Sequence, residues 1–240
     1  QRIADMHTRL GKDDKAAQSA PKLSHVMLTA RAKVLMKPGV DVWRQSLKEP
    51  QDAGFAARPP AKKIAAWYTA ALSGVQLQDY KAARAAAEQL KPLVKGDLAA
   101  ERLAQLLAAE VEMAAGDAQA ALREVDASPQ KVTVDTGRPE LVMRTQALLQ
   151  LQRTPEVTGT LQTWVAAHPK DSGIWLLLSR AWAQQNQPLR AIRAEGEAQV
   201  ANYDYAAAVD RFRAGQDMAR KGGADFVEAS IIDTRLREVQ

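Results

Sequence analysis

A short sequence element recurs along this chain at nearly constant intervals. A helix-capping residue such as Asp79 or Asp204 is followed by a tyrosine and then by alanines. Aligning these restarts places small or apolar residues at one equivalent position: Ala83, Ala121, Val157 and Ala191, spaced 38, 36 and 34 residues apart, with Ala208 a further 17 residues on. A period of this size is typical of stacked units that bury their apolar faces against their neighbours. Whatever the fold, it repeats one unit.

The repeated unit has the pattern of a pair of amphipathic helices. Apolar residues recur three and four positions apart, which places them on one helical face: Ile64, Trp67, Tyr68, Ala71, Leu72 and Val75. N-cap residues and prolines mark where the following helices begin: Asp79, Asp117, Thr154, Pro155 and Pro188. Because 17 is half of 34, the helix over Pro188–Ala201 is expected to be the second helix of one pair and the first helix of the next.

Composition agrees with an all-helical fold. The chain has 240 residues, 46% of them apolar, which is enough for one elongated domain or two compact ones. Aromatic residues make up only 5%, so the core consists of small side chains, which suit closely approaching helices. The one strand candidate, residues 131–135, is interpreted as an extended loop. We predict an all-α fold, a right-handed α-α superhelix of antiparallel helix pairs.

The residues at the repeated positions resemble the tetratricopeptide repeat. Trp67 and Ala71 match the first helix of that signature, and Tyr80 and Ala83 match its turn and second helix. Further partial matches stand at Trp175, Leu178, Ser179, Trp182 and Ala191, in the proline turn His168-Pro169-Lys170-Asp171, and at Tyr205, Ala208 and Phe212. The resemblance implies a tetratricopeptide-like solenoid that binds other proteins.

A narrower resemblance covers most of the chain. Gln1-Arg2-Ile3-Ala4-Asp5, the run over 31–35 (Arg-Ala-Lys-Val-Leu) and the segment over 225–233 (Asp-Phe-Val-Glu-Ala-Ser-Ile-Ile-Asp) are similar to the β-barrel assembly-enhancing protease family of periplasmic zinc metallopeptidases. In that family a catalytic domain bearing H-E-x-x-H precedes a tetratricopeptide domain. The resemblance implies that this chain begins just after a peptidase domain, which holds the zinc, and that its partners are that domain and outer-membrane β-barrel proteins or their assembly machinery in the periplasm.

No catalytic site is predicted in the chain itself. It has no H-E-x-x-H motif, and its histidines, His7, His25 and His168, lie far apart in the sequence. Cysteine is absent, which excludes disulfides, cysteine metal sites and thiol nucleophiles. Carboxylates two residues apart, Glu110 with Glu112 and Glu195 with Glu197, point to different helix faces and are interpreted as solvated charges. We therefore expect no catalytic residue, no metal site and no cofactor in this chain.

Function is instead assigned to the inner face of each pair's first helix. The register above predicts a partner-binding groove lined by Tyr68, Gln76, Glu110, Gln146, Gln150, Arg180 and Gln184. Amide side chains at these positions suit hydrogen bonding to extended backbone, and Arg180 is suited to a carboxylate. The same residues are also compatible with ordinary solvent-facing positions.

Residues 1–56 are expected to form a basic helical segment that links to the peptidase domain, and residues 57–240 the repeat domain. Residues 1–63 hold 13 Lys/Arg against 6 Asp/Glu, and the rest of the chain holds 20 against 22. A helix carrying Phe226, Ala229, Ile231, Ile232 and Leu236 is expected to cover the end of the stack. Three alternatives stay open: an independent scaffold, an α-solenoid enzyme such as a cell-wall hydrolase, and nucleic-acid binding through residues 1–63, of which we expect no trace at physiological salt.

Overall fold

The computed structural model describes residues 22–127, 137–222 and 225–240, and within these ranges the chain is helical and contains no strand. This confirms the predicted all-α fold. The predicted loop at 131–135 lies outside the described residues. The chain packs as two compact units, Gln1–Ala115 and Gly116–Gln240, called unit 1 and unit 2 below. The expected division at residues 56 and 57 differs from this one, because the helices before residue 57 pack into the core of unit 1.

Unit 1 is built from five α-helices and three short 3₁₀ turns within the described residues. In chain order these are α2 (Leu23–Leu35), α3 (Val40–Lys48), η1 (Glu49–Gln51), η2 (Phe55–Ala57), α4 (Pro60–Gln76), α5 (Tyr80–Leu90), η3 (Lys91–Val94) and α6 (Leu98–Ala114). α4 and α5 pack as a pair joined by a tight turn, and α6 packs against both of them. Ala83 lies at the closest approach of the pair, where it faces Gly74. This explains why the repeat requires a small residue at that position.

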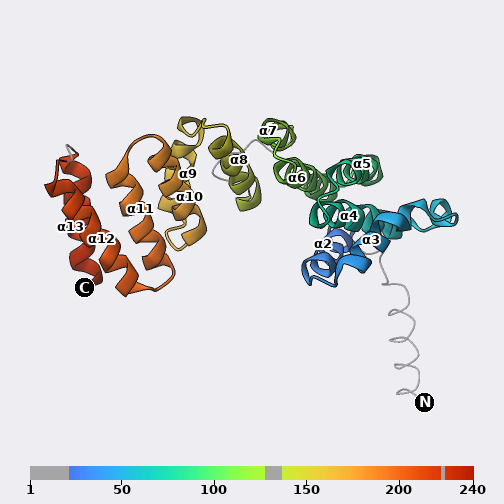
Figure 1. The fold of residues 1–240 in the computed structure, drawn as a ribbon, viewed down its shortest axis with the longest axis horizontal. Coiled ribbons are helices and arrows are strands. Elements are labelled where there is room, and N and C mark those ends of the chain that lie inside the picture. Colours follow the sequence, from blue (N-terminus) through green and yellow to red (C-terminus); the bar gives the residue numbers. More distant parts are fainter. Residues whose placement is uncertain (1–21, 128–136, 223–224) are drawn as a thin grey trace, which may run out of the picture. The chain divides into compact units, whose positions relative to one another are not determined.

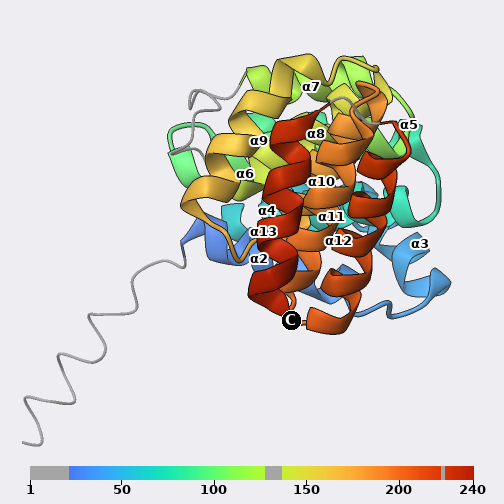
Figure 2. The same ribbon diagram turned by 90° about the vertical axis from the view of Figure 1, so that its left-hand side faces the viewer.

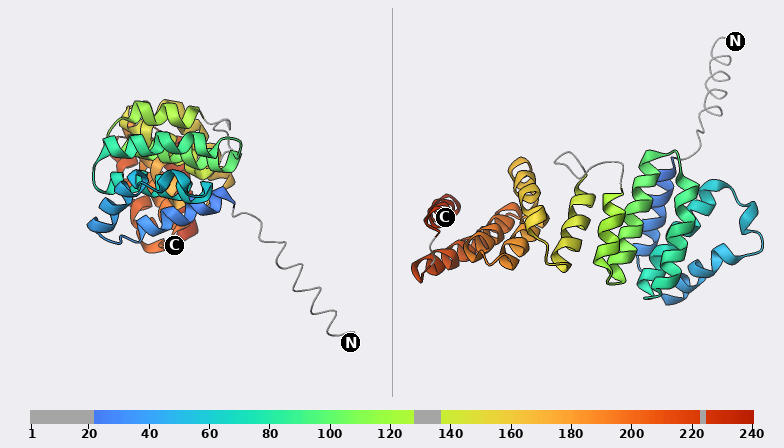
Figure 3. Two further views of the ribbon diagram at one scale, coloured as in Figure 1. Left: turned by 90° about the vertical axis from the view of Figure 1, so that its right-hand side faces the viewer. Right: turned by 90° about the horizontal axis from the view of Figure 1, so that it is seen from above.

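Helix α2 packs on α4 and α6, as α5 does, but lies on the other side of α4 (Figure 1). The right-hand view of Figure 3 shows α2 alongside both helices. Its apolar stripe, Met27, Ala30 and Val34, recurs at helical spacing and belongs to the same buried cluster as Tyr68 and Leu72. α2 is therefore part of the core of unit 1.

Unit 2 continues the helical series after the described end of unit 1. Its helices are α7 (Ala118–Asp126), α8 (Arg138–Gln150), α9 (Pro155–Ala167), α10 (Ser172–Gln184), α11 (Pro188–Ala201), α12 (Tyr205–Arg220) and α13 (Phe226–Val239). Each helix packs against the next along the chain, and α8 also contacts α10 directly. Together with the neighbour packing in unit 1, this confirms a helical-repeat arrangement of short-looped helices.

Helix α11 has the double role that the half-period predicts. It packs against α10 on one side and α12 on the other, and Figure 2 shows α13 beside this group. A Cβ placed on Gly196 of α11 would lie 2.4 Å from the buried ring of Phe212 in α12. Only glycine leaves room for the ring at this position. The contact between α11 and α12 therefore places a small residue, Gly196, opposite a large aromatic residue, Phe212.

Most predicted N-caps are confirmed. The carboxylates of Asp79, Asp117 and Asp204 accept backbone N–H groups three residues on. Asp225 caps α13 in the same way. For Thr154 the predicted N-cap position is correct, but the capping hydrogen bond expected from its side chain is not formed. Thr154 stands at the N-cap of α9, but its side chain makes no capping bond, and its Oγ1 instead accepts from Gln185 at 3.3 Å.

The aromatic residues that match the repeat signature differ in burial. Trp182 is buried, but Trp175 is only half-buried, and its indole Nε1 donates to the Pro169 carbonyl at 3.0 Å. In α13, Ile232 and Leu236 are buried against α12 as predicted. Phe226, expected to cover the stack with them, is 84% exposed because it occupies the first turn on the outer side.

Candidate functional site

The predicted groove residues fall into two groups, one in each unit. Tyr68, Gln76 and Glu110 belong to α4 and α6 of unit 1, and Gln146, Gln150, Arg180 and Gln184 belong to α8 and α10 of unit 2. We call these surfaces inner face 1 and inner face 2. Within each unit the two helices concerned pack against each other, so each group forms a surface of its own.

Inner face 1 is occupied by α2. Arg31 of α2 forms a bidentate ion pair with Glu110 of α6. Nη1 lies 2.6 Å from Oε2, and Nη2 lies 3.2 Å from Oε1. Tyr68 of α4 is 2% exposed and lies in the same buried cluster as the apolar stripe of α2. Tyr68 is thus buried and Glu110 is paired with another residue of the same chain. Of the three predicted residues on this face, Gln76 alone is exposed.

The electrostatics of this cluster follow from its partial burial. Burial raises the pKa of the Tyr68 phenol, because the phenolate would lose solvation, and the nearby Arg31 charge opposes that rise. The hydrogen bonds that Arg31 donates to Glu110 raise the pKa of the guanidinium above its ordinary value, although desolvation acts against this rise. The cluster therefore combines a neutral phenol with an ion pair that joins α2 to α6.

Inner face 2 is exposed. Gln146 and Gln150 stand one turn apart on α8, and Arg180 and Gln184 one turn apart on α10, and all four side chains are exposed. Gln184 Nε2 donates to the Leu149 carbonyl of α8 at 3.0 Å, which joins the two helices at this surface. Within the described ranges, no ion pair involves Arg180. This surface presents amides and one guanidinium to solvent.

Asp171 holds the helices of inner face 2 together. Its carboxylate caps α10 at Ile174 N, accepts from Arg138 of α8 at 2.8 Å, and accepts from the indole Nε1 of Trp164 in α9 at 3.0 Å. Burial of Asp171 acts to raise its pKa, but the bonds from Arg138 and Trp164 outweigh it and hold that pKa below its usual value. One carboxylate thus orders three helices.

The interpretation of the spaced carboxylates as solvated charges was wrong, although they do point to different neighbours. Glu112 pairs with Arg84 of α5, and Glu197 pairs with Arg235 of α13. Glu195 accepts from the Ser179 hydroxyl of α10 and lies 3.5 Å from Arg211. These carboxylates serve as links between helices, which the sequence spacing alone does not reveal.

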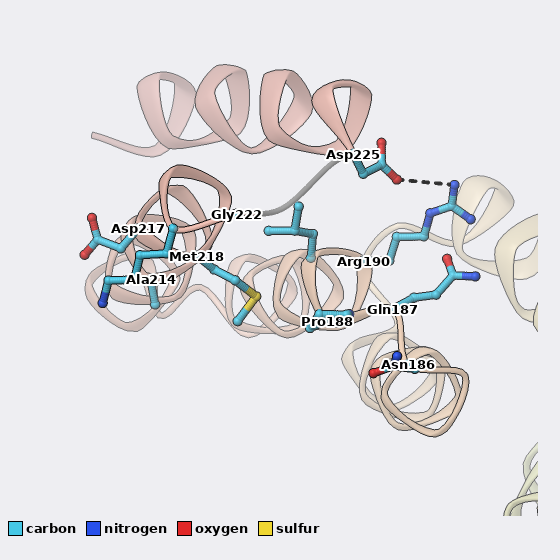
Figure 4. A pocket seen from close by; sticks show the side chains of 11 residues that line it. Asn186, Gln187, Pro188, Arg190, Ala214, Asp217, Met218, Gly222 and Asp225 are labelled. Atoms are coloured by element: carbon cyan, nitrogen blue, oxygen red, sulfur yellow. Dashed lines mark ion pairs between the residues drawn. The ribbon is translucent and has the colours of Figure 1, made fainter.

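A cavity of about 760 Å³ lies at the end of unit 2, among the start of α11, the end of α12 and the start of α13 (Figure 4). Its wall is apolar where Pro188, Leu189 and Met218 meet. The Arg190 guanidinium stacks over Trp182 at 5.0 Å and lies 3.7 Å from Asp225. The arginine that lines this cavity thus contacts both an aromatic ring and a carboxylate.

A second cavity of about 820 Å³ lies in unit 1, between the end of α2, α3 and α4. Val34, Val42 and Trp43 contribute apolar surface, and Lys33 and Lys62 stand at its rim. Arg58, which also lines it, is paired with Glu49 and Asp52. None of the predicted groove residues lines either cavity.

The described part of the chain contains no cluster of three or more His, Asp or Glu side chains arranged to bind a metal. His168 stacks on the Trp164 ring, with 4.3 Å between centroids, and its Nδ1 lies 3.2 Å from the Trp164 carbonyl. His25 is exposed on α2, and His7 lies outside the described residues. Across residues 22–127, 137–222 and 225–240, no helix is both long and apolar enough to span a bilayer.

Comparison with known proteins adds no family assignment: the chain matches no protein-family model, and no curated protein matches it significantly.

Proposed function

We propose that this chain is a non-catalytic protein-interaction module and that inner face 2 is its binding surface. The observation that carries the proposal is the exposed set of amide and guanidinium side chains on two packed helices. Gln146, Gln150, Arg180 and Gln184 all face solvent there. A side-chain amide both donates and accepts hydrogen bonds, and a guanidinium binds a carboxylate in a bidentate geometry. This set of side chains therefore suits a polypeptide ligand.

We further propose that the module is of the tetratricopeptide type and is the repeat domain of a periplasmic zinc metallopeptidase. The residue matches at the repeated positions support the first part, and the similarity of the segments at both ends of the chain supports the second. In this proposal the zinc and the chemistry belong to a peptidase domain outside this chain. The module recruits or positions substrates and outer-membrane protein assembly partners.

Site-specific photocrosslinking in cells tests the binding surface. A photoreactive residue at Gln150 or Gln184 is expected to capture discrete protein partners. The matched control is the same residue at Gln162, which is equally exposed but lies on α9. Equal labelling from all three positions, or none, contradicts the assignment of inner face 2.

The parent protein is tested separately by its size and location. An antibody raised against this chain should detect a periplasmic species much larger than the 26.2 kDa of the chain alone. That species should contain stoichiometric zinc when purified under native conditions. A product of about 26 kDa, or one confined to another compartment, eliminates the metallopeptidase assignment and leaves the interaction surface to be judged by crosslinking.

A further inference from the structure

Equivalent positions of the repeat carry charges of opposite sign. The position eleven residues before the repeated small residue is occupied by Leu72, Glu110, Gln146, Arg180 and Glu197. Both glutamates are bound by an arginine from an adjacent helix: Glu110 by Arg31 of α2, and Glu197 by Arg235 of α13 at 2.6 and 2.9 Å. Arg180 is the one cation of this series, and it is exposed.

A flanking position is apolar in four of the five repeats. Fifteen residues before the small residue stand Tyr68 and Leu106 in unit 1, and Val142 and Leu176 in unit 2, whereas the fifth repeat has Arg193, which pairs with Glu228 of α13. In unit 1 Tyr68 lies in the buried cluster that contains the apolar stripe of α2. In unit 2 Leu176 is 39% exposed. Inner face 2 therefore combines exposed apolar surface with a cation at the position where inner face 1 has a carboxylate.

We propose that inner face 2 binds an amphipathic helix of a partner protein, with a carboxylate that pairs with Arg180 and small apolar side chains that cover Val142 and Leu176. The proposal rests on the proposed function and specifies its ligand. The partner helix would reproduce α2 with its central charge reversed. Amphipathic helices commonly dock in this way, with anchors one turn apart.

Two observations favour a helix with acidic character over other ligands. Inner face 1 shows that two neighbouring helices of this repeat accept a third helix through a stripe of methionine, alanine and valine. A guanidinium beside apolar surface selects a carboxylate, because an unpaired charge would be costly to cover and a like charge would be repelled. A neutral or basic helix would leave Arg180 covered and unpaired.

The probe for this proposal derives from α2 itself. A peptide of residues 22–36 is held helical by a hydrocarbon link between positions 29 and 33, which both lie on the exposed side of α2, and is made with and without the Arg31→Glu change. Binding to the full chain is measured by fluorescence anisotropy, with a photoreactive label on the peptide to map the contact. The variants of the chain are R180E, R180Q and R213E, the last altering an exposed arginine on α12.

The R31E peptide is expected to bind the unaltered chain about tenfold more tightly than the parent peptide, with crosslinks on α8 and α10. R180E should reverse this preference, R180Q should abolish it, and R213E should leave it unchanged. Equal affinity of the two peptides, insensitivity to R180E or the absence of binding overturns the helix proposal. If photocrosslinking in cells still captures partners from Gln184, the proposed function survives that failure.

Discussion

Inner face 1 and inner face 2 are built from the same repeat, yet one is covered and the other is open. On α4 and α6 an additional helix, α2, buries Met27, Ala30 and Val34 and pairs Arg31 with Glu110. On α8 and α10 the corresponding side chains face solvent. The repeat therefore specifies how helices pair, whereas the residues on its inner surface decide whether a further helix belongs there.

The chemistry of the two faces explains the difference. Inner face 1 has Tyr68 and Leu72 on α4. Both side chains are buried, and exposing their apolar surface to water would cost free energy. Inner face 2 has Gln146 and Arg180 at the position of Leu72 and Glu110, and these side chains remain hydrated at no cost. Inner face 2 therefore gains less free energy than inner face 1 from being covered by a helix of its own chain.

The largest expected effect compares truncations on the two faces. Met27→Ala removes a fully buried side chain between α2 and its neighbours and should destabilise unit 1 by about 2–5 kcal/mol. Leu176→Ala removes a partly exposed side chain and should cost less than about 1 kcal/mol. Urea unfolding, followed by hydrogen exchange in each unit, measures both. If the two variants lose similar stability, α2 is not an integral part of inner face 1.

The next effect concerns Asp171, which orders the helices beneath inner face 2. Asp171→Ala removes a helix cap and two charge-assisted bonds and should destabilise unit 2 by about 2–3 kcal/mol at neutral pH. Asp171→Asn keeps a capping side chain and should cost less. Equal losses in the two variants would mean that the charge of Asp171 contributes nothing.

The same residue predicts a pH dependence. The pKa of Asp171 is lowered in the folded state, so its contribution is complete above the unfolded-state pKa of aspartate, about 3.9, and is lost as the pH falls through the folded-state pKa. The stability difference between the unaltered chain and D171N should therefore shrink below pH 4. Thermal unfolding from pH 7 to pH 2.5 measures it, and a difference that stays constant over this range would contradict the prediction.

A smaller effect is expected for the ion pair that joins α2 to α6. Both side chains are about one-third exposed, so Glu110→Arg should cost only about 1–2 kcal/mol, part of it from repulsion between two arginines. The charge swap Arg31→Glu with Glu110→Arg should recover about half of that loss. A double-mutant cycle on unfolding free energies gives the coupling. A coupling of zero would show that the apolar stripe alone places α2.

The sequence predicts the helices and most of their starts because these features are local. Asp79, Asp117, Asp204 and Asp225 cap the turns that follow them, and the spacing of Ala83, Ala191 and Ala208 reflects close helix contacts within one pair. The double role of α11 also follows from spacing, because it involves consecutive helices. The exposed position of Phe226 was missed because a helical apolar pattern does not say which residue falls beyond the neighbouring helix.

Only half of the candidate site could be predicted, because the other half depends on contacts between residues far apart in the sequence. The register identifies Gln146, Gln150, Arg180 and Gln184 correctly as exposed residues on neighbouring helices. It does not reveal that Arg31 binds Glu110 or that Tyr68 is buried with the apolar stripe of α2, since Arg31 and Glu110 are 79 residues apart and α2 precedes the repeats. One signal was available: Met27, Ala30, Arg31 and Val34 form a stripe at helical spacing that the sequence interpretation left unused.

The variant with the smallest expected effect on stability should have the largest effect on partner binding. Arg180→Ala alters an exposed side chain with no ion pair within the described residues, and the free energy of unfolding should change by less than about 0.5 kcal/mol. Crosslinking from Gln184 should nevertheless fall, because the partner loses its counter-ion. Arg213→Ala is the matched control and should leave both measurements unchanged. A stability loss above about 1 kcal/mol for R180A would instead mean that Arg180 supports the fold, and the contrast between an occupied face and an open one would no longer hold.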